Sequence, residues 1–228
     1  MNNLLIAGLG QIKAAKTVYQ TQKNDCYSDG ERKWMEFGQQ LRHVTLLPLL
    51  RLLTKLRITA DILTAIALVL GFLFLPLWLK GYSTWAFCCL VTHVLLDGLD
   101  GPLARFQGAA SPRGSFTDTF ADQIVLSVVT LSWMITLGDA TAIAAGTSYI
   151  FLYAGVVALA MVRNALHIPY SWLVRPRFIV YAALFIDTVL ASNWTIAVIW
   201  VCNAILLIKL MSGFYYLRLA LPGPEEQS

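Results

Sequence analysis

The chain has 228 residues, of which 57% are hydrophobic and only 13% charged, and its mean hydropathy is +0.64. This composition excludes an ordinary soluble domain and indicates an integral membrane protein. The net charge of +4 comes from basic residues at the ends of apolar segments, so it indicates membrane topology and not nucleic-acid binding. The four cysteines show neither a disulfide framework nor the spacing of a zinc site.

Residues 1–57 are predicted to form a cytoplasmic N-terminal segment. Its first 30 residues contain no long apolar core and no cleavage site of the secretory kind, so a signal peptide is not expected. From Glu31 to Arg57, apolar residues recur at helical spacing with basic residues between them. This pattern predicts an amphipathic helix, broken near Pro48, that lies on an anionic membrane surface.

Six apolar segments follow, and most reach the roughly 20 residues that are needed to span hydrocarbon. In chain order they cover residues 61–79, 84–106, 116–138, 142–163, 177–191 and 195–216, and the fifth is short. The predicted fold is therefore an all-α integral membrane protein. It has six transmembrane helices in a domain of residues 58–218, preceded by the amphipathic surface helix and followed by a short polar tail of residues 219–228.

The basic residues predict how this bundle is oriented. Short connections near Lys80, Asp139 and Asn193 predict hairpins on one side of the membrane, and of the 17 Lys and Arg residues only Lys80 falls there. Basic residues are retained on the cytoplasmic side. Both termini, and the junction between the second and third segments, are therefore predicted to face the cytoplasm.

Four aspartates lie at that junction. Asp97 and Asp100 are three residues apart, and Asp118 and Asp122 are four apart, so each pair shares one helix face. An antiparallel hairpin would bring the faces together, with Pro102 expected to bend or break the first helix. Because carboxylates at membrane depth repel one another, the cluster predicts two bound Mg²⁺ ions that would clamp a diphosphate. Mn²⁺ would also fit, whereas zinc would lack its usual His or Cys ligands.

Small and basic residues accompany the aspartates. Gly101, Ala104 and Gly114 would let a base or a diphosphate approach the backbone, and Arg105 and Arg113 offer planar donors to phosphate oxygens. Taken singly, these residues would serve equally well as helix-packing positions and interfacial anchors. Only their combination with the four carboxylates points to a nucleotide site.

The stretch from Asp97 to Asp122 fits the pattern D-x-x-D-G-x-x-A-R-x8-G-x3-D-x3-D at every fixed position. This pattern is the highly specific signature of the CDP-alcohol phosphotransferase (CDP-alcohol phosphatidyltransferase, class I) family, which the chain resembles from about residue 58 to residue 216. The resemblance implies a membrane enzyme that moves a phosphatidyl or related phosphoalcohol group from a CDP-linked donor to a hydroxyl acceptor and releases CMP.

The resemblance also implies roles for individual residues. Asp97, Asp100, Asp118 and Asp122 match the ligands of two Mg²⁺ ions, and Asp122 also matches the proposed general base. The positions that match the nucleotide-binding part of the family are Gly101, Ala104, Arg105, Gly114, Asp61 and Thr64.

Asp61 and Thr64 lie in a stretch where the chain departs from the family pattern, with Ala60 in place of Pro and Asp61 in place of Asn. Many members resemble Thr-Pro-Asn-x-x-Thr at the start of the first span, whereas this chain reads Thr59-Ala-Asp61-Ile-Leu-Thr64. Thr59 or Asp61 would serve equally well as a simple helix N-cap. The role of Asp61 in nucleotide binding therefore stays open at this point.

The candidates for binding the acceptor are four arginines, since a guanidinium group pairs with phosphate through two parallel hydrogen bonds; they are Arg113, Arg163, Arg175 and Arg177. Family members that use a phosphorylated acceptor resemble this chain in having basic residues near residues 163–177. Ordinary membrane topology would also place arginines there. The favoured substrates are CDP-diacylglycerol and a small polar alcohol such as glycerol 3-phosphate or an inositol phosphate.

Two other functions fit part of the pattern. An intramembrane prenyltransferase also binds a Mg²⁺-diphosphate through aspartates, but from two motifs far apart in sequence, and a cation transporter would carry its carboxylates near mid-membrane. The family resemblance further implies a homodimer, for which Gly146, Ala154 and Gly155 would allow close helix contact. The short, compact chain fits a bacterial inner membrane.

Overall fold

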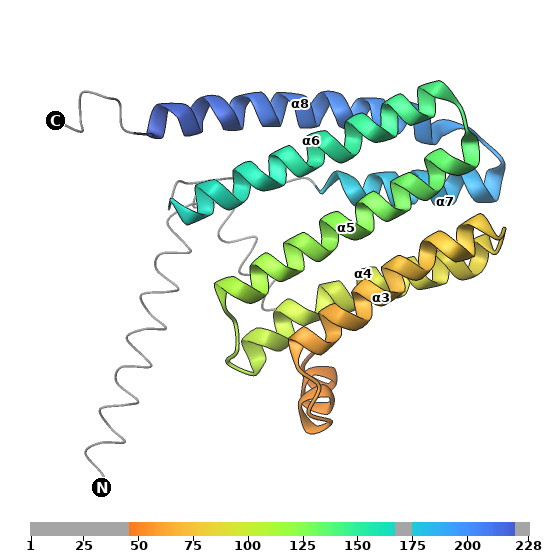
Figure 1. The fold of residues 1–228 in the computed structure, drawn as a ribbon. Coiled ribbons are helices and arrows are strands. Elements are labelled where there is room, and N and C mark those ends of the chain that lie inside the picture. Colours follow the sequence, from red (N-terminus) through yellow and green to blue (C-terminus); the bar gives the residue numbers. More distant parts are fainter. Residues whose placement is uncertain (1–45, 167–174, 222–228) are drawn as a thin grey trace, which may run out of the picture.

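The computed structural model describes residues 46–166 and 175–221, and within these ranges the protein is all-helical (Figure 1). A short helix at residues 46–55 comes first. The long helices then follow as α3 (Ala60–Leu79), α4 (Ser83–Phe106), α5 (Pro112–Leu137), α6 (Ala140–Ala165), α7 (Pro176–Leu190) and α8 (Trp194–Ala220). The all-helical fold class predicted from the sequence is confirmed.

Five of these helices are long and apolar enough to cross a membrane, namely α3, α4, α5, α6 and α8. The sixth expected span, α7, is present but has only 15 residues. At 1.5 Å per residue it is about 22 Å long, which is less than the hydrocarbon core of about 30 Å. The outer faces of the helices expose large apolar side chains, such as Val69, Phe151 and Ile208, as expected for contact with lipid.

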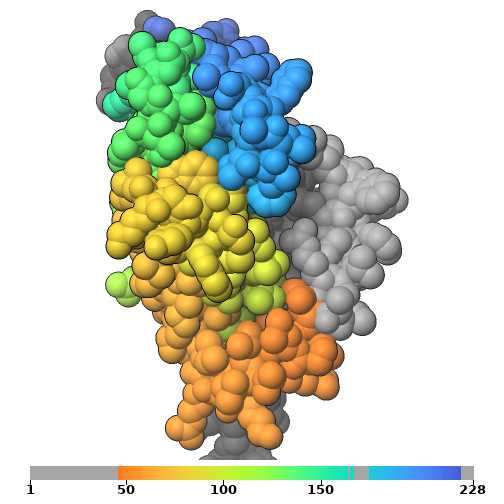
Figure 2. All heavy atoms as spheres, turned by 90° about the vertical axis from the view of Figure 1, so that its right-hand side faces the viewer, coloured from red at the N-terminus to blue at the C-terminus, as the bar shows by residue number. Residues whose placement is uncertain are grey.

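The helices form an up-and-down bundle with tight hairpins at one end (Figure 1). Residues 80–82, 138–139 and 191–193 make these hairpins, and Figure 2 views the end at which they meet. Gly138 adopts a left-handed conformation with φ of 62° and donates its N–H to the Met134 carbonyl at 3.0 Å, which ends α5 sharply. The turn between α4 and α5 lies at the opposite end of the bundle (Figure 1).

Glycines allow close helix packing inside the bundle. A Cβ added to Gly71 of α3 would overlap the Val125 side chain of α5, and one added to Gly146 of α6 would overlap Met134. A Cβ on Gly155 would lie 3.0 Å from Leu210 of α8. Gly146 and Gly155 therefore serve contacts within the chain, which corrects the expectation that they would mediate a dimer, because their close approaches are already occupied.

The helix at residues 46–55 confirms the C-terminal part of the predicted amphipathic helix, while residues 31–45 lie outside the described residues. It passes through Pro48, so no break occurs there within the part that the structure describes. Fully buried Leu50 packs with Leu63 of α3 and Leu103 of α4, whereas Leu52 and Arg51 are exposed. The short helix is thus fixed against the end of α4 that carries the aspartates.

Candidate active site

The turn between α4 and α5 brings the two aspartate pairs together. Gly108 ends α4 with φ of +69°, which favours glycine, and the next N–H, that of Ala109, bonds to the Ala104 carbonyl at 2.8 Å. Ser111 then caps α5 by accepting the Gly114 N–H at 3.1 Å, with Pro112 as the first helical residue. These local signals reverse the chain within a few residues and place the start of α5 beside the end of α4.

Pro102 lies inside α4, which continues to Phe106. Of the predicted bend or break at this residue, a break is therefore ruled out. Proline removes only one backbone donor, the N–H that would bond to the carbonyl of Gly98. Neighbouring Leu103 is fully buried, and its packing against the short helix and α3 favours a continuous α4.

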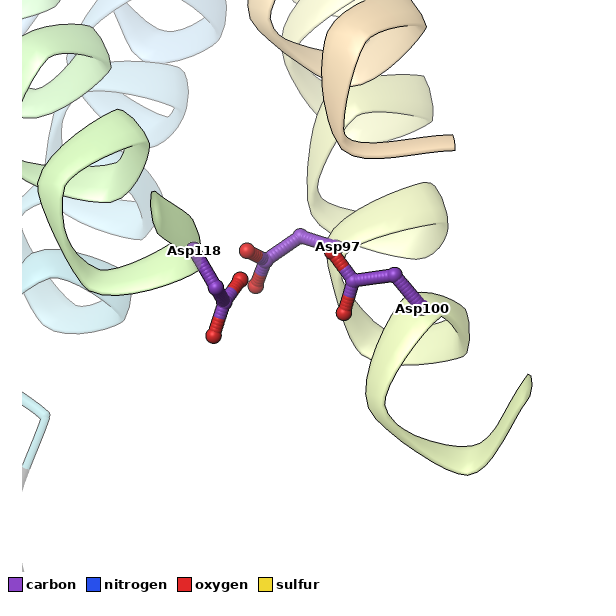
Figure 3. A group of neighbouring side chains, drawn as sticks. All are labelled: Asp97, Asp100 and Asp118. Carbon is purple, nitrogen blue, oxygen red and sulfur yellow. The ribbon is translucent and has the colours of Figure 1, made fainter. Parts of the chain in front are cut away.

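Three of the four aspartates form a cluster that could hold a metal ion. One carboxylate oxygen from each of Asp97, Asp100 and Asp118 lies within 4.8 Å of the others. Figure 3 shows Asp118 of α5 pointing toward Asp97 and Asp100 of α4. Asp118 Oδ1 is buried and accepts no hydrogen bond. An oxygen-only donor set with an unsatisfied buried carboxylate oxygen fits a hard divalent cation such as Mg²⁺ or Mn²⁺.

Asp100 is held in this cluster by a residue from the first span. The Thr64 hydroxyl donates to Asp100 Oδ2 at 2.7 Å, and only 5% of Asp100 is exposed. At the start of the same helix, Thr59 accepts the Ile62 N–H at 3.3 Å and is the N-cap of α3. Asp61 is exposed in the first turn. The N-cap interpretation is thus confirmed for Thr59, and a nucleotide contact by Asp61 stays a prediction.

Asp122 lies next to this cluster and is paired with a guanidinium group from α7. Arg177 donates through Nη2 to Asp97 Oδ2 at 3.0 Å, and its Nη1 forms an ion pair with Asp122 Oδ2. Only 3% of the Arg177 side chain is exposed. The structure therefore places three carboxylates together and binds the fourth through an arginine bridge that also contacts Asp97.

These five side chains comprise four acidic groups and one guanidinium. If all four carboxylates are ionised, three negative charges are in excess, and Asp122 Oδ1 is, like Asp118 Oδ1, buried without a hydrogen-bond partner. Buried charge without compensation is costly. Divalent cations would remove this cost, so the electrostatics and the donor atoms favour the same kind of ligand.

The residues predicted to contact the nucleotide lie along the same end of α4 and the start of α5. Arg105 reaches back over Gly101, since a Cβ added to Gly101 would lie 3.6 Å from Arg105 Nη1. Ala104 is half-buried, and a Cβ on Gly114 would lie 3.5 Å from the capping Ser111 hydroxyl. Gly101 and Gly114, like Ala104, are partly exposed. Their contact with a nucleotide stays a prediction.

The four candidate acceptor arginines lie in different environments. Arg113 and Arg175 are exposed, and Arg163 is half-buried in the last turn of α6. Arg177 is buried and already binds two carboxylates. Arg177 is therefore in direct contact with two of the four aspartates.

The contacts made by Thr64 and Arg177 were not foreseen from the sequence. The sequence predicts that Thr64 binds the nucleotide and that Arg177 binds the acceptor. The sequence does contain a pattern that indicates a buried Arg177. Arg177, Val180, Tyr181 and Leu184 are spaced so that they share one helix face, and the structure shows that this face is buried. An arginine on an apolar face requires a carboxylate partner. His93, for which the sequence indicates no catalytic partner, is buried and donates from Nδ1 to the Ala67 carbonyl at 2.9 Å.

Comparison with known proteins identifies a family for most of this chain. The family model described as CDP-alcohol phosphatidyltransferase matches residues 57–214. The inner membrane protein YnjF of Escherichia coli is 33% identical over 108 residues, which are 46% of this chain and 52% of YnjF. The archaetidylinositol phosphate synthase of Aeropyrum pernix is 42% identical over 50 residues, 22% of this chain and 26% of that protein. The chain thus matches about half or less of these curated relatives.

Solved structures of one enzyme share the fold. The phosphatidylinositol phosphate synthase of Mycobacterium tuberculosis with CDP-DAG bound superposes with a TM-score of 0.65 at 19% identity and covers 74% of this chain and 90% of that one. The same enzyme in complex with manganese and citrate gives a TM-score of 0.63 at 19% identity, covering 74% and 86%. At this identity the likeness establishes the fold alone.

Proposed function

The chain belongs to the CDP-alcohol phosphatidyltransferase family, and from this premise we propose that it transfers a phosphatidyl group from CDP-diacylglycerol to a small polar alcohol and releases CMP. The observation that carries the proposal is the cluster of Asp97, Asp100 and Asp118 at the α4–α5 turn. All three belong to the signature that identifies the family, and a shared oxygen site is what a metal-assisted diphosphate reaction requires.

The metal proposal is that Asp97, Asp100 and Asp118, with Asp122 as a fourth ligand, hold two Mg²⁺ ions for which Mn²⁺ can substitute. Support comes from the unsatisfied Asp118 Oδ1 and Asp122 Oδ1 and from the manganese complex of the mycobacterial enzyme. When bound, such ions would neutralise the diphosphate and favour attack on its phosphorus. Thr64 would keep the Asp100 carboxylate oriented through its 2.7 Å hydrogen bond.

The proposed reaction is a direct displacement in which a new bond forms between the acceptor oxygen and the phosphorus of the phosphatidyl group. The bond from that phosphorus to the oxygen of CMP breaks, and the acceptor hydroxyl loses its proton. Asp122 is the proposed general base, because its Oδ1 is free of protein hydrogen bonds while Oδ2 is paired with Arg177. Arg105, beside Gly101, is proposed to contact the CMP portion together with Ala104, Gly114 and Thr64.

The acceptor is proposed to carry a phosphate. Arg113, Arg163, Arg175 and Arg177 are the proposed contacts, and Arg177 also lies against Asp97 and Asp122. An inositol phosphate is favoured by the names of two similar proteins, the archaetidylinositol phosphate synthase and the mycobacterial phosphatidylinositol phosphate synthase. Glycerol 3-phosphate is the second acceptor to test. Asp61 is retained as a secondary nucleotide contact.

The setting of this site is an integral membrane bundle. We place both termini and the aspartates on the cytoplasmic side, because among the described basic residues only Lys80 lies at the hairpin end. The family match over residues 57–214 supports residues 58–218 as the catalytic domain. An inner membrane location follows the description of YnjF. A homodimer remains part of the proposal, with its contacts on faces other than Gly146 and Gly155.

The deciding experiment incubates purified protein with Mg²⁺, CDP-diacylglycerol and a panel of acceptors, and measures released CMP together with the lipid product. Asp118→Asn removes one clustered carboxylate and is expected to abolish CMP release. Asp139→Asn makes the same chemical change at the far end of the bundle, where Asp139 Oδ2 caps α6 by accepting the Ala142 N–H. Asparagine caps equally well, so this variant is expected to retain activity. Absence of CMP from every CDP-alcohol tested would overturn the proposal.

A further inference from the structure

Arg177 is a buried cation that bridges the two aspartate helices from a third helix. Its two terminal nitrogens bind different carboxylates, Nη2 that of Asp97 on α4 and Nη1 that of Asp122 on α5. The planar guanidinium is suited to bridging two carboxylates, whereas an ammonium group is a single point charge. The first turn of α7 therefore acts as a clamp across the site.

This clamp engages two carboxylates that are also proposed to bind metal ions. Asp97 belongs both to the three-carboxylate cluster and to the arginine bridge, and Asp122 Oδ2 faces the guanidinium. Two cations a few ångströms apart repel strongly at a poorly solvated site. The guanidinium also holds one oxygen of Asp122, the proposed fourth metal ligand. Binding of both metal ions therefore competes with binding of Arg177 to Asp97 and Asp122.

We propose that Arg177 is a built-in counter-cation of the aspartate site, which divalent metal binding displaces from Asp97 and Asp122. Displacement makes the carboxylate oxygens that Arg177 holds available to the metal ions. The inference rests on the proposed function in its metal assignment, and it adds a residue that competes with the metal. The contacts of the first turn of α7 would then change when the site binds metal ions.

The test measures Mn²⁺ binding to the purified full chain by calorimetry, without substrate. Arg177→Gln removes the competing cation and is expected to bind Mn²⁺ about tenfold more tightly, which corresponds to about 1.4 kcal/mol. Arg177→Lys keeps the charge but cannot bridge both carboxylates, so its affinity is expected to lie between those of Arg177→Gln and the wild type. Arg175→Gln is the matched control, because Arg175 is exposed, and its affinity is expected to equal that of the wild type.

A second readout is thermal stability in chelator and in excess Mn²⁺. In chelator Arg177→Gln is expected to have a lower Tm than the wild type, because two buried carboxylates lose their partner. Mn²⁺ is expected to restore it, with a larger rise in Tm than in the wild type. If Arg177→Gln does not fold in detergent, the Arg177→Lys variant carries both comparisons.

The outcomes separate displacement from its alternatives. Unchanged or weaker Mn²⁺ binding by Arg177→Gln would show that the arginine organises the site and does not compete with the metal, and the inference would be wrong. An Arg177→Lys affinity equal to that of the wild type, or an equal gain in Arg175→Gln, would reduce the effect to general charge and would also overturn it. Because no substrate is present, these results are independent of whether CMP release is detected.

Discussion

The hydrogen bond from Thr64 to Asp100 makes a prediction whose magnitude follows from the structure. The hydroxyl donates to Asp100 Oδ2 at 2.7 Å, a shorter distance than the 3.1 Å to the Ala60 carbonyl, and a hydroxyl has a single proton. Asp100 is 5% exposed, so water cannot readily replace the lost donor. Thr64→Val keeps the shape of the side chain but removes the proton. A hydrogen bond to a charged group contributes about 1.5–3 kcal/mol, which corresponds to a loss of about 10- to 150-fold.

The loss is expected in Mn²⁺ affinity and in the Mg²⁺ dependence of CMP release. Calorimetry with Mn²⁺ measures the first, and a Mg²⁺ titration of initial rates measures the second. Because Thr64 acts through Asp100, raising the Mg²⁺ concentration is expected to restore part of the activity of Thr64→Val. Thr64→Ser retains the hydroxyl and is the matched control, with an expected loss far smaller than that of the valine variant.

One result would refute this reasoning. If Thr64→Val bound Mn²⁺ as the wild type does, and only the KM for the CDP-linked donor rose, Thr64 would be a nucleotide contact and not a support for Asp100. That outcome would favour the role implied by the family resemblance over the one implied by the 2.7 Å contact. A loss of both metal affinity and donor affinity would assign the residue to both tasks.

Three further perturbations test the base, the metal and the packing. Asp122→Asn is expected to lower kcat for CMP release by about 10²- to 10⁴-fold, because the amide cannot accept the acceptor proton; full activity would mean that the assigned base is wrong. Removing divalent ions with a chelator is expected to abolish CMP release, and adding back Mg²⁺ or Mn²⁺ to restore it, whereas unaffected activity would exclude a metal role. Gly71→Ala is expected to destabilise the protein by about 1–3 kcal/mol, measured as a fall in Tm, because the added methyl overlaps Val125. Gly98→Ala is the steric control, since nothing lies within 4 Å of its added Cβ, and an equal loss of stability there would contradict the packing argument.

Much of the bundle could be predicted because its signals are local. Each long apolar segment became a helix, and each tight connection became a hairpin, since hydropathy and glycine or proline signals act over a few residues. The differences from the expected bundle were also local. Pro102 did not break α4, because the buried packing of Leu103 outweighs the loss of one backbone hydrogen bond. The apolar segment at α7 formed a helix of 15 residues, which is shorter than the five helices that are long enough to cross a membrane.

The grouping of Asp97, Asp100 and Asp118 could also be predicted, because residues three or four apart share a helix face and a short turn joins the two helices. The position of Asp122 relative to them could not. Its partner Arg177 lies 55 residues further along the chain, on a helix whose approach depends on the packing of the whole bundle. The glycines assigned to a dimer were misjudged for the same reason, since the sequence does not say which helix a small residue will face.

The sequence by itself determined the membrane class, the helix order, the family signature and the chemistry of an oxygen-rich metal site. Those properties follow from residue type and short spacing, which are fixed before the chain folds. Only the tertiary structure decided that Thr64 holds Asp100 and that Arg177 binds both Asp97 and Asp122. These contacts join α3 and α7 to the α4–α5 turn, and they are selected because a charge buried without a partner would be costly.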